Sequence, residues 1–186
     1  MSSTLPEGAT QVRRRNRTVT DETWIRDFLH RAPLCTLGTV HEGWPFLNSN
    51  LFLYDEAAHV IYLHTAGTGR TRSNIEADGR VCISVSEMGR LLPGEKVTDY
   101  SVEYASVVIF GQARVVADPQ EARAVLQGQL DKYFPHMRPG RDYAPFTDEE
   151  MGRATIYRVD IESWSAKTLQ EPEDYPGAFR YPDFPG

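Results

Sequence analysis

Residues 64–72 carry the densest set of chemically active side chains in the sequence. A histidine, two glycines, three threonines and two arginines follow one another where an apolar, strand-like run ends and a helical pattern begins. Free backbone N–H groups at a helix start, with hydroxyl and guanidinium groups beside them, can bind a phosphate. The spacing matches neither the P-loop nor the GxGxxG fingerprint. The segment is therefore either a phosphate cradle or an ordinary turn whose arginines face solvent.

A polar triplet, Asn48, Ser49 and Asn50, interrupts the apolar run of residues 45–54. Polar side chains in a strand are costly to bury without hydrogen-bond partners. These three side chains consequently either face water at the edge of a sheet or line a polar ligand site.

Further candidates are single residues, each of which also has a simple structural interpretation. Ser106 lies near the start of a long run of strand formers, whereas Trp164 and Lys167 end the last strand-like segment. A small strand residue, a core aromatic and a surface cation are the ordinary roles of these types. His64 is either a group that moves protons near neutral pH or a strand-end histidine that bonds a backbone carbonyl.

The elements that position these residues follow from hydrophobic periodicity and from capping signals. Asp118-Pro119 with Glu121 has the arrangement of a capping box, which predicts a helix start there. Gly111 predicts a bend in the longest strand. The predicted strands span residues 34–40, 45–54, 60–65, 80–85, 101–116 and 157–162, and the predicted helices span residues 20–32, 70–77, 118–134 and 147–150.

These six strands do not alternate with helices as they do in a doubly wound fold. The pattern instead favours a mainly β (α+β) protein, in which an antiparallel six-stranded barrel is flanked by peripheral helices. At 186 residues the chain predicts a single domain, residues 20–168. A polar, solvated arm of residues 1–19 precedes it, and a Pro-rich tail of residues 169–186 follows as a disordered segment or one draped over a surface.

Composition narrows the classes of partner. The net charge of −6 gives weak overall attraction to nucleic acid. No apolar stretch approaches a membrane span and no signal core is present, which predicts a cytoplasmic protein without a membrane partner. Cys35 and Cys82 lie in apolar, strand-like runs without metal-ligand spacing. Two buried, reduced thiols and no metal site are therefore expected.

Taken together, these segments resemble a known family. Residues 64–81, residues 104–107 with Gly111, and residues 164–167 are similar to the FMN-binding split β-barrels related to pyridoxamine 5'-phosphate oxidase. Within that group, His64 and the run of residues 86–93 resemble the nitroimidazole-resistance (Nim-type) branch. The resemblance covers roughly residues 20–168 of the chain.

The resemblance implies a homodimer with FMN in clefts between the subunits and with His64 as the catalytic proton donor. Thr71 stands where many relatives have a lysine, so one cationic contact to the phosphate is missing unless Arg72 supplies it. The residues that the resemblance assigns to FMN binding are Asn48, Ser49, Asn50, Thr65, Gly69, Arg70, Thr71, Arg72, Ser106, Trp164 and Lys167.

The implied activity is FMN-dependent reduction of nitroimidazole-type or other small aromatic substrates. Oxidation of pyridoxamine phosphate is disfavoured, because an acidic, Pro-rich segment follows Lys167 in place of the Arg/His pattern of the oxidases. Two alternatives remain open. One is an FMN-binding module without efficient turnover, and the other is a haem-handling split barrel with a histidine as axial ligand.

Overall fold

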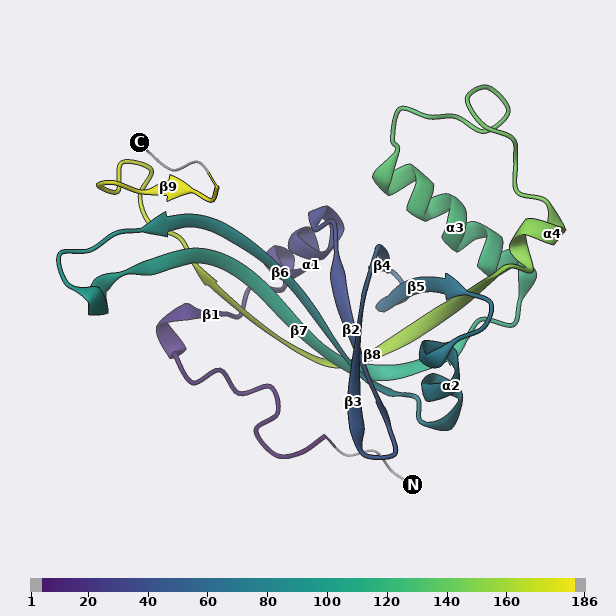
Figure 1. Cartoon of the computed structure of the whole chain (residues 1–186), viewed down its shortest axis with the longest axis horizontal. Helices are drawn as coiled ribbons and strands as arrows, with labels where there is room; N and C mark the ends of the chain where they lie inside the picture. Colours follow the sequence, from purple (N-terminus) through teal and green to yellow (C-terminus); the bar gives the residue numbers. More distant parts are fainter. Residues whose placement is uncertain (1–4, 183–186) are drawn as a thin grey trace.

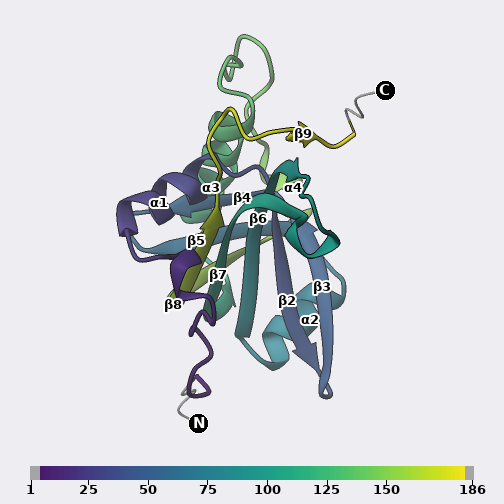
Figure 2. The same ribbon diagram turned by 90° about the vertical axis from the view of Figure 1, so that its left-hand side faces the viewer.

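The computed structural model describes residues 5–182. Nine strands form one sheet, in which seven follow the order β3-β2-β6-β7-β8-β5-β4 (Figures 1 and 2). All of the pairings are antiparallel, and the short strands β1 and β9 pair with β8 and β6. The strands are β1 Thr18–Val19, β2 Cys35–His41, β3 Trp44–Asn50, β4 Phe52–Asp55, β5 Val60–Ala66, β6 Arg80–Leu92, β7 Ser101–Val115, β8 Ala154–Leu169 and β9 Phe179–Arg180.

The mainly antiparallel β fold is as predicted, but the detail of a six-stranded barrel is not. The predicted strand of residues 45–54 is divided at Leu51, because β3 pairs with β2 whereas β4 pairs with β5. In the described part of the chain no ladder joins β3 to β4, so the sheet is open between them. A continuous run of strand formers does not reveal that its two halves pair with different neighbours.

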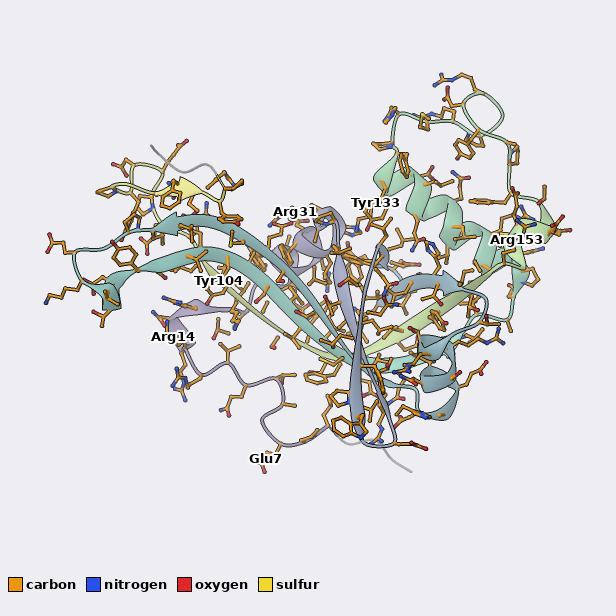
Figure 3. All side chains as sticks on the ribbon, viewed as in Figure 1. Glu7, Arg14, Arg31, Tyr104, Tyr133 and Arg153 are labelled. Carbon is orange, nitrogen blue, oxygen red and sulfur yellow. The ribbon has the colours of Figure 1, made fainter. Side chains whose placement is uncertain are left out.

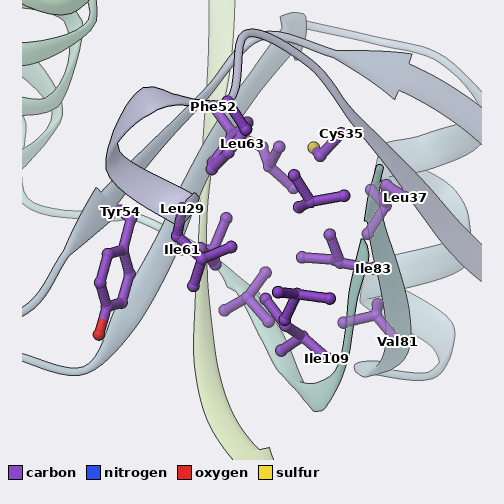
Figure 4. Close-up of a cluster of buried hydrophobic side chains, with 14 of the residues drawn as sticks. Leu29, Cys35, Leu37, Phe52, Tyr54, Ile61, Leu63, Val81, Ile83 and Ile109 are labelled. Atoms are coloured by element: carbon purple, nitrogen blue, oxygen red, sulfur yellow. The ribbon is translucent and has the colours of Figure 1, made fainter. Parts of the chain in front are cut away.

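One face of the sheet curves round the main core. Leu37, Ile83 and Ile109 lie in register on neighbouring strands β2, β6 and β7, and all three are buried (Figure 4). Helix α1, Glu22–Arg31, adds Phe28 and Leu29 to this core. Burying one such side chain contributes about 1.5–3 kcal/mol. The core therefore fixes which face of each strand points inward.

Three of the four α-helices in the described part of the chain begin where capping signals predict. The Asp21 side chain accepts hydrogen bonds from the first turn of α1, and Asp118 caps α3, Pro119–Tyr133. Thr147 and Glu150 form a capping box at α4, Asp148–Met151. Helix α2 spans Arg70–Ala77, and two short 3-10 helices, η1 Arg15–Arg17 and η2 Val97–Asp99, complete the set.

Helix α3 covers the outer face of β5. Val125 and Leu126 of α3 pack with Val60 and Tyr62 of β5 in a second core. Ile61 and its neighbour Leu63 point the other way, into the main core. Successive residues of a strand alternate between its faces, so β5 is covered on both sides.

Strands β6 and β7 continue beyond the core as a long hairpin (Figure 1). The predicted bend at Gly111 is a register shift between β7 and β8, where a Cβ would clash with the carbonyl oxygen of Asp160. On this hairpin, Arg90 of β6 forms an ion pair with Glu103 of β7. The Arg90 guanidinium also donates hydrogen bonds to carbonyls of residues 171–173, which hold the C-terminal segment against β6.

Cys35 and Cys82 are both free thiols, as predicted, but only Cys35 is buried as expected. Cys35 lies in the core, where burial raises its pKa to about 12. Cys82 is half-buried on β6, and burial raises its pKa as well. Among residues 5–182, no helix is both long enough and apolar enough to span a membrane.

Candidate functional site

The N-terminus of α2 is open. Gly69 occupies the N-cap position with a φ of +139°, a conformation that L side chains rarely adopt. No side chain caps the first turn of the helix, and that turn holds no acidic residue. The first backbone N–H groups of a helix lack partners within the helix, so those of α2 are available to an anion.

Three residues of the edge strand β3 face this helix end. Phe46 and Asn48 alternate with exposed residues and lie on the half-buried face of the strand. The Arg70 guanidinium carbon is 4.5 Å from the centre of the Phe46 ring, and Asn48 Nδ2 donates to Thr71 Oγ1 at 3.4 Å. Asn50 Nδ2 donates to the backbone oxygen of Asn48 at 3.0 Å. Asn48, Gly69, Arg70 and Thr71 are named the α2 cradle below.

The cradle carries an uncompensated positive charge. Among the described residues, Arg70 has no carboxylate partner. An arginine fork, a hydroxyl group, an amide N–H and free helix N–H groups together match the acceptors of a phosphate group.

Arg72 is turned away from the cradle. Its Nε donates to Glu76 at 2.7 Å and its Nη1 donates to the Gly67 carbonyl at 2.8 Å. The hydrogen bond and ion pair with Glu76 raise the pKa of Arg72. Arg72 therefore does not take the place of the lysine that Thr71 replaces.

The polar triplet of β3 is divided between the two faces of the strand. Ser49 is exposed on the face opposite Asn48 and Asn50, and its Oγ lies 3.4 Å from Oγ1 of Thr36 on β2. The contacts of β3 with the cradle residues of α2 therefore come from Phe46 and Asn48.

His64 contacts α3. Its Nδ1 lies 2.6 Å from Oε1 of Gln129, a residue that is 5% exposed. With Oε1 toward the ring, Nδ1 carries the proton and donates it, which leaves Nε2 free. Thr65, the next residue, faces the opposite side of β5, where its Oγ1 lies 2.9 Å from the Tyr157 hydroxyl.

Gln129 was not among the residues singled out from the sequence. It follows Leu126 by three positions on the buried side of α3. A polar residue within the apolar stripe of a helix was the available signal, because a buried amide needs a partner.

Ser106, Trp164 and Lys167 do not join the α2 cradle within one chain. Ser106 and Lys167 are paired across β7 and β8 and line a cavity on the outer face of the sheet. Trp164 points to the opposite face of β8, where its ring packs at 6.4 Å from Tyr54 and at 4.7 Å from His59. A site that combines all the expected residues would need a second copy of the chain.

The outer face of β3, β2, β6 and β7 also has an apolar depression. A cavity of about 470 Å³ is lined by Val40, Leu47, Cys82 and Phe110, with Leu5 of the N-terminal segment beside them. Leu47 is 76% exposed. A large exposed apolar patch commonly marks an interface.

The protein is therefore an antiparallel β protein in which the edge strand β3 and the short helix α2 bring together groups suited to bind an anion. The family model of pyridoxamine 5'-phosphate oxidase matches residues 21–168. The chain belongs to this family, and the resemblance stated from the sequence is confirmed. No curated protein sequence matches the chain significantly.

Solved structures share the fold at low sequence identity. The flavocytochrome Anf3 from Azotobacter vinelandii is 22% identical with a TM-score of 0.73, over 95% of this chain and 86% of that one. The FAD and haem binding protein from Mycobacterium smegmatis is 21% identical with a TM-score of 0.74, over 85% and 76%. A putative 5-nitroimidazole antibiotic resistance protein from Bacteroides thetaiotaomicron is 20% identical with a TM-score of 0.67, over 81% and 86%.

Proposed function

We propose that this chain is an FMN-dependent reductase of nitroimidazole-type or other small aromatic substrates. The observation that carries the proposal is the α2 cradle, a set of phosphate-binding groups beside the edge strand of a sheet in a flavin-related family. Arg70, Thr71, Asn48 and the N-terminus of α2 would hold the phosphate of the cofactor. A bound flavin supplies the electron transfer that no side chain of the chain provides.

His64 is the proposed proton donor. The hydrogen bond from Nδ1 to Gln129 fixes the ring, so that Nε2 is the atom that exchanges a proton with the substrate. Reduction of a nitro group consumes protons together with electrons. A half-buried imidazole near the end of β5, the strand that leads into the turn before α2, is suited to supply them.

We propose that the working unit is a homodimer formed through the outer face of the sheet. Leu47 is 76% exposed in the single chain and lies on the face of β3 opposite to that of the cradle residue Asn48. A second copy covering the outer face would bury Leu47. It would also bring a second Ser106 and Lys167 beside β3.

Haem binding is the second candidate function, and the His64–Gln129 hydrogen bond favours it. A histidine that binds iron through one ring nitrogen usually donates the other N–H to an oxygen acceptor. His64 meets that condition, with Nε2 as the free nitrogen. Two of the structures with this fold are named as a flavocytochrome and as a FAD and haem binding protein.

One spectroscopic experiment separates these functions. The purified protein is examined for flavin absorption and for a Soret band, then reduced anaerobically and mixed with a nitroimidazole. We expect a flavin spectrum that bleaches on reduction and returns when the nitroimidazole is added. A flavin that stays reduced would indicate an FMN-binding module without efficient turnover. A Soret band without flavin would establish the haem function instead.

A further inference from the structure

A cavity of about 660 Å³ lies where the first two turns of α1, the turn between β4 and β5, and strand β8 meet. Its charged and aromatic lining consists of Glu22, Arg26, Glu56, His59, Glu162 and Trp164. Figure 3 labels Arg31, the last residue of α1, and the cavity lies toward the other end of that helix. The cavity shares no residue with the α2 cradle, and it is named the α1 cavity below.

The lining of the α1 cavity carries more negative than positive charge. Three carboxylates, those of Glu22, Glu56 and Glu162, line it together with a single guanidinium group. Arg26 Nη2 lies 2.7 Å from the Glu22 carboxylate, and its Nη1 lies 3.4 Å from the Glu56 carboxylate. The charge of Arg26 is therefore already offset, and the excess of carboxylates attracts a cation.

Aromatic rings form one wall of the α1 cavity. The His59 ring meets the Trp164 ring in a T-shaped contact at 4.7 Å, and both residues line the cavity. The face of an indole ring attracts an ammonium group within about 6 Å of its centre. Within one chain, Trp164 thus belongs to this cavity and not to the α2 cradle.

Tyr54 gives an independent indication of a ligand. It is 3% exposed, and its hydroxyl group has no hydrogen-bond partner among the described residues. Figure 4 shows this hydroxyl group pointing away from the other core side chains. Burial raises the pKa of Tyr54, and the charges of Arg26 and Glu56, which line the α1 cavity, also act on this pKa. The hydroxyl group therefore lies next to the cavity, where an N–H donor would satisfy it.

The arrangement of the carboxylates does not suit a metal ion. Among residues 5–182, no three His, Cys, Asp or Glu side chains are placed so that they could hold one. An organic ammonium ion needs no such convergence, because each of its N–H groups donates to one acceptor. A chain with several ammonium groups can reach carboxylates that lie apart.

We propose that the α1 cavity binds a polyamine, an alkyl chain that carries two or more ammonium groups. One ammonium group donates to Glu56 and to the Tyr54 hydroxyl, another donates to Glu162, and the alkyl chain lies against the aromatic wall. The cavity volume is within the range of small-molecule sites, about 300–1,000 Å³. This site goes beyond the proposed function, because neither the α2 cradle nor His64 takes part in it.

Calorimetric titration with spermidine tests the proposal, on the protein as purified with its cofactor and in physiological salt. Tyr54→Phe removes only the hydroxyl group, and we expect spermidine to bind at least about tenfold more weakly, as for loss of a hydrogen bond to a charged group. The free energy of unfolding of the ligand-free variant should not fall, because the hydroxyl group has no partner to lose. Unchanged affinity in this variant would overturn the proposal.

Glu56→Gln/Glu162→Gln removes two carboxylates of the cavity and should also weaken spermidine binding at least about tenfold. Glu42→Gln/Glu95→Gln is the charge-matched control, since both residues are exposed and neither lines the cavity. We expect the control pair to bind spermidine as the wild type does.

Absence of spermidine binding by the wild type would overturn the proposal. Equal weakening in the control pair would also overturn it, because attraction to the net charge of −6 would then explain the binding. Displacement of spermidine by Mg²⁺ at constant ionic strength would do the same, since the carboxylates would then act as a metal site. The flavin spectrum tests the proposed function separately, because none of these variants alters the α2 cradle or His64.

Discussion

Nδ1 of His64 lies 2.6 Å from Oε1 of Gln129, across the contact between β5 and α3. Val60 and Tyr62 share this face of β5 and pack against the same helix. The hydrogen bond therefore stands at the end of an apolar interface, where the ring has little freedom to rotate. It links the candidate catalytic group to a helix that contributes nothing to the α2 cradle.

We expect His64→Ala to reduce a nitroimidazole at least about 100-fold more slowly, the lower end of the usual contribution of a positioned proton donor. Loss of an ordinary hydrogen bond costs only about 1 kcal/mol of stability. The variant should therefore remain yellow and melt close to the wild type. Steady-state kinetics and thermal melts check both points. Near-normal turnover would show that His64 lines the pocket without donating a proton.

Gln129→Leu should lower kcat by about tenfold without raising KM, because it removes the acceptor that orients the ring. Gln129→Glu retains an acceptor oxygen, and we expect it to recover most of the lost rate. A purely structural role would instead lower stability in both variants and leave the kcat of the folded protein unchanged. Kinetics combined with urea unfolding distinguishes these outcomes.

Arg70→Ala should weaken FMN binding by about 10–150-fold, the range for a charge-assisted hydrogen bond. Arg72→Ala is the matched control, since Arg72 is engaged with Glu76 and the Gly67 carbonyl. Riboflavin, which lacks the phosphate, should bind all three proteins alike. Thr71→Lys should tighten FMN binding by restoring a cation. Equal FMN affinity of the Arg70 variant and the wild type in fluorescence titration would show that Arg70 does not bind the phosphate.

Much of the fold follows from local signals in the sequence. The helix starts at Asp21 and Asp118 and the bend at Gly111 lie where capping and glycine chemistry predict. The length of β6 could not be predicted from such signals. Residues 86–90, which are mostly polar, form a strand because β7 lies alongside them. The two-residue strands β1 and β9 are too short for any periodicity to be visible.

The candidate site was predictable in part. The turn before Arg70 and the polar residues of β3 were recognised, and the structure brings Asn48 to Thr71. Gln129 was missed because its partner is 65 residues away in the sequence. The sequence also did not predict which face of β8 carries Trp164, because a bulge in the β7–β8 ladder precedes it.

The ion pair between Arg90 and Glu103 predicts an acid-sensitive hairpin. Arg90 donates to both carboxylate oxygens, at 2.6 Å and 2.9 Å, and holds the pKa of Glu103 at about 2. Since this pKa is below the ordinary 4.5, the contribution to stability is complete above pH 4.5 and is lost as the pH falls toward 2.

Urea unfolding at a series of pH values checks the effect, with Glu103→Gln as the comparison. We expect the free energy of unfolding of the wild type to fall more steeply with acidification than that of the variant. At neutral pH the variant should be less stable by about 3 kcal/mol, because Arg90 would be left without its partner. Parallel pH profiles would show that the pair does not contribute in this way.

Leu47→Glu should convert the proposed dimer into a monomer, because a charge in the centre of an apolar interface is costly to bury. Phe134→Glu is the control, an equally drastic change at an exposed position after α3, 48% exposed and away from the outer face of β3. Light scattering after size-exclusion chromatography measures the mass of each variant. A wild type that is already monomeric and still binds FMN stoichiometrically would contradict the shared site.

His64 and Thr65 face opposite sides of β5. The side to which the histidine points therefore depends on whether the number of residues before it in the strand is odd or even. Deleting or inserting one residue within the strand would place Leu63 or Thr65 opposite Gln129 and turn the histidine to the other face of the strand. A change of two residues would restore the faces but move the histidine along the sheet by about 7 Å. Length changes are therefore tolerable in the turn before β5 and not inside it, so the strand is constrained in length as strictly as in composition.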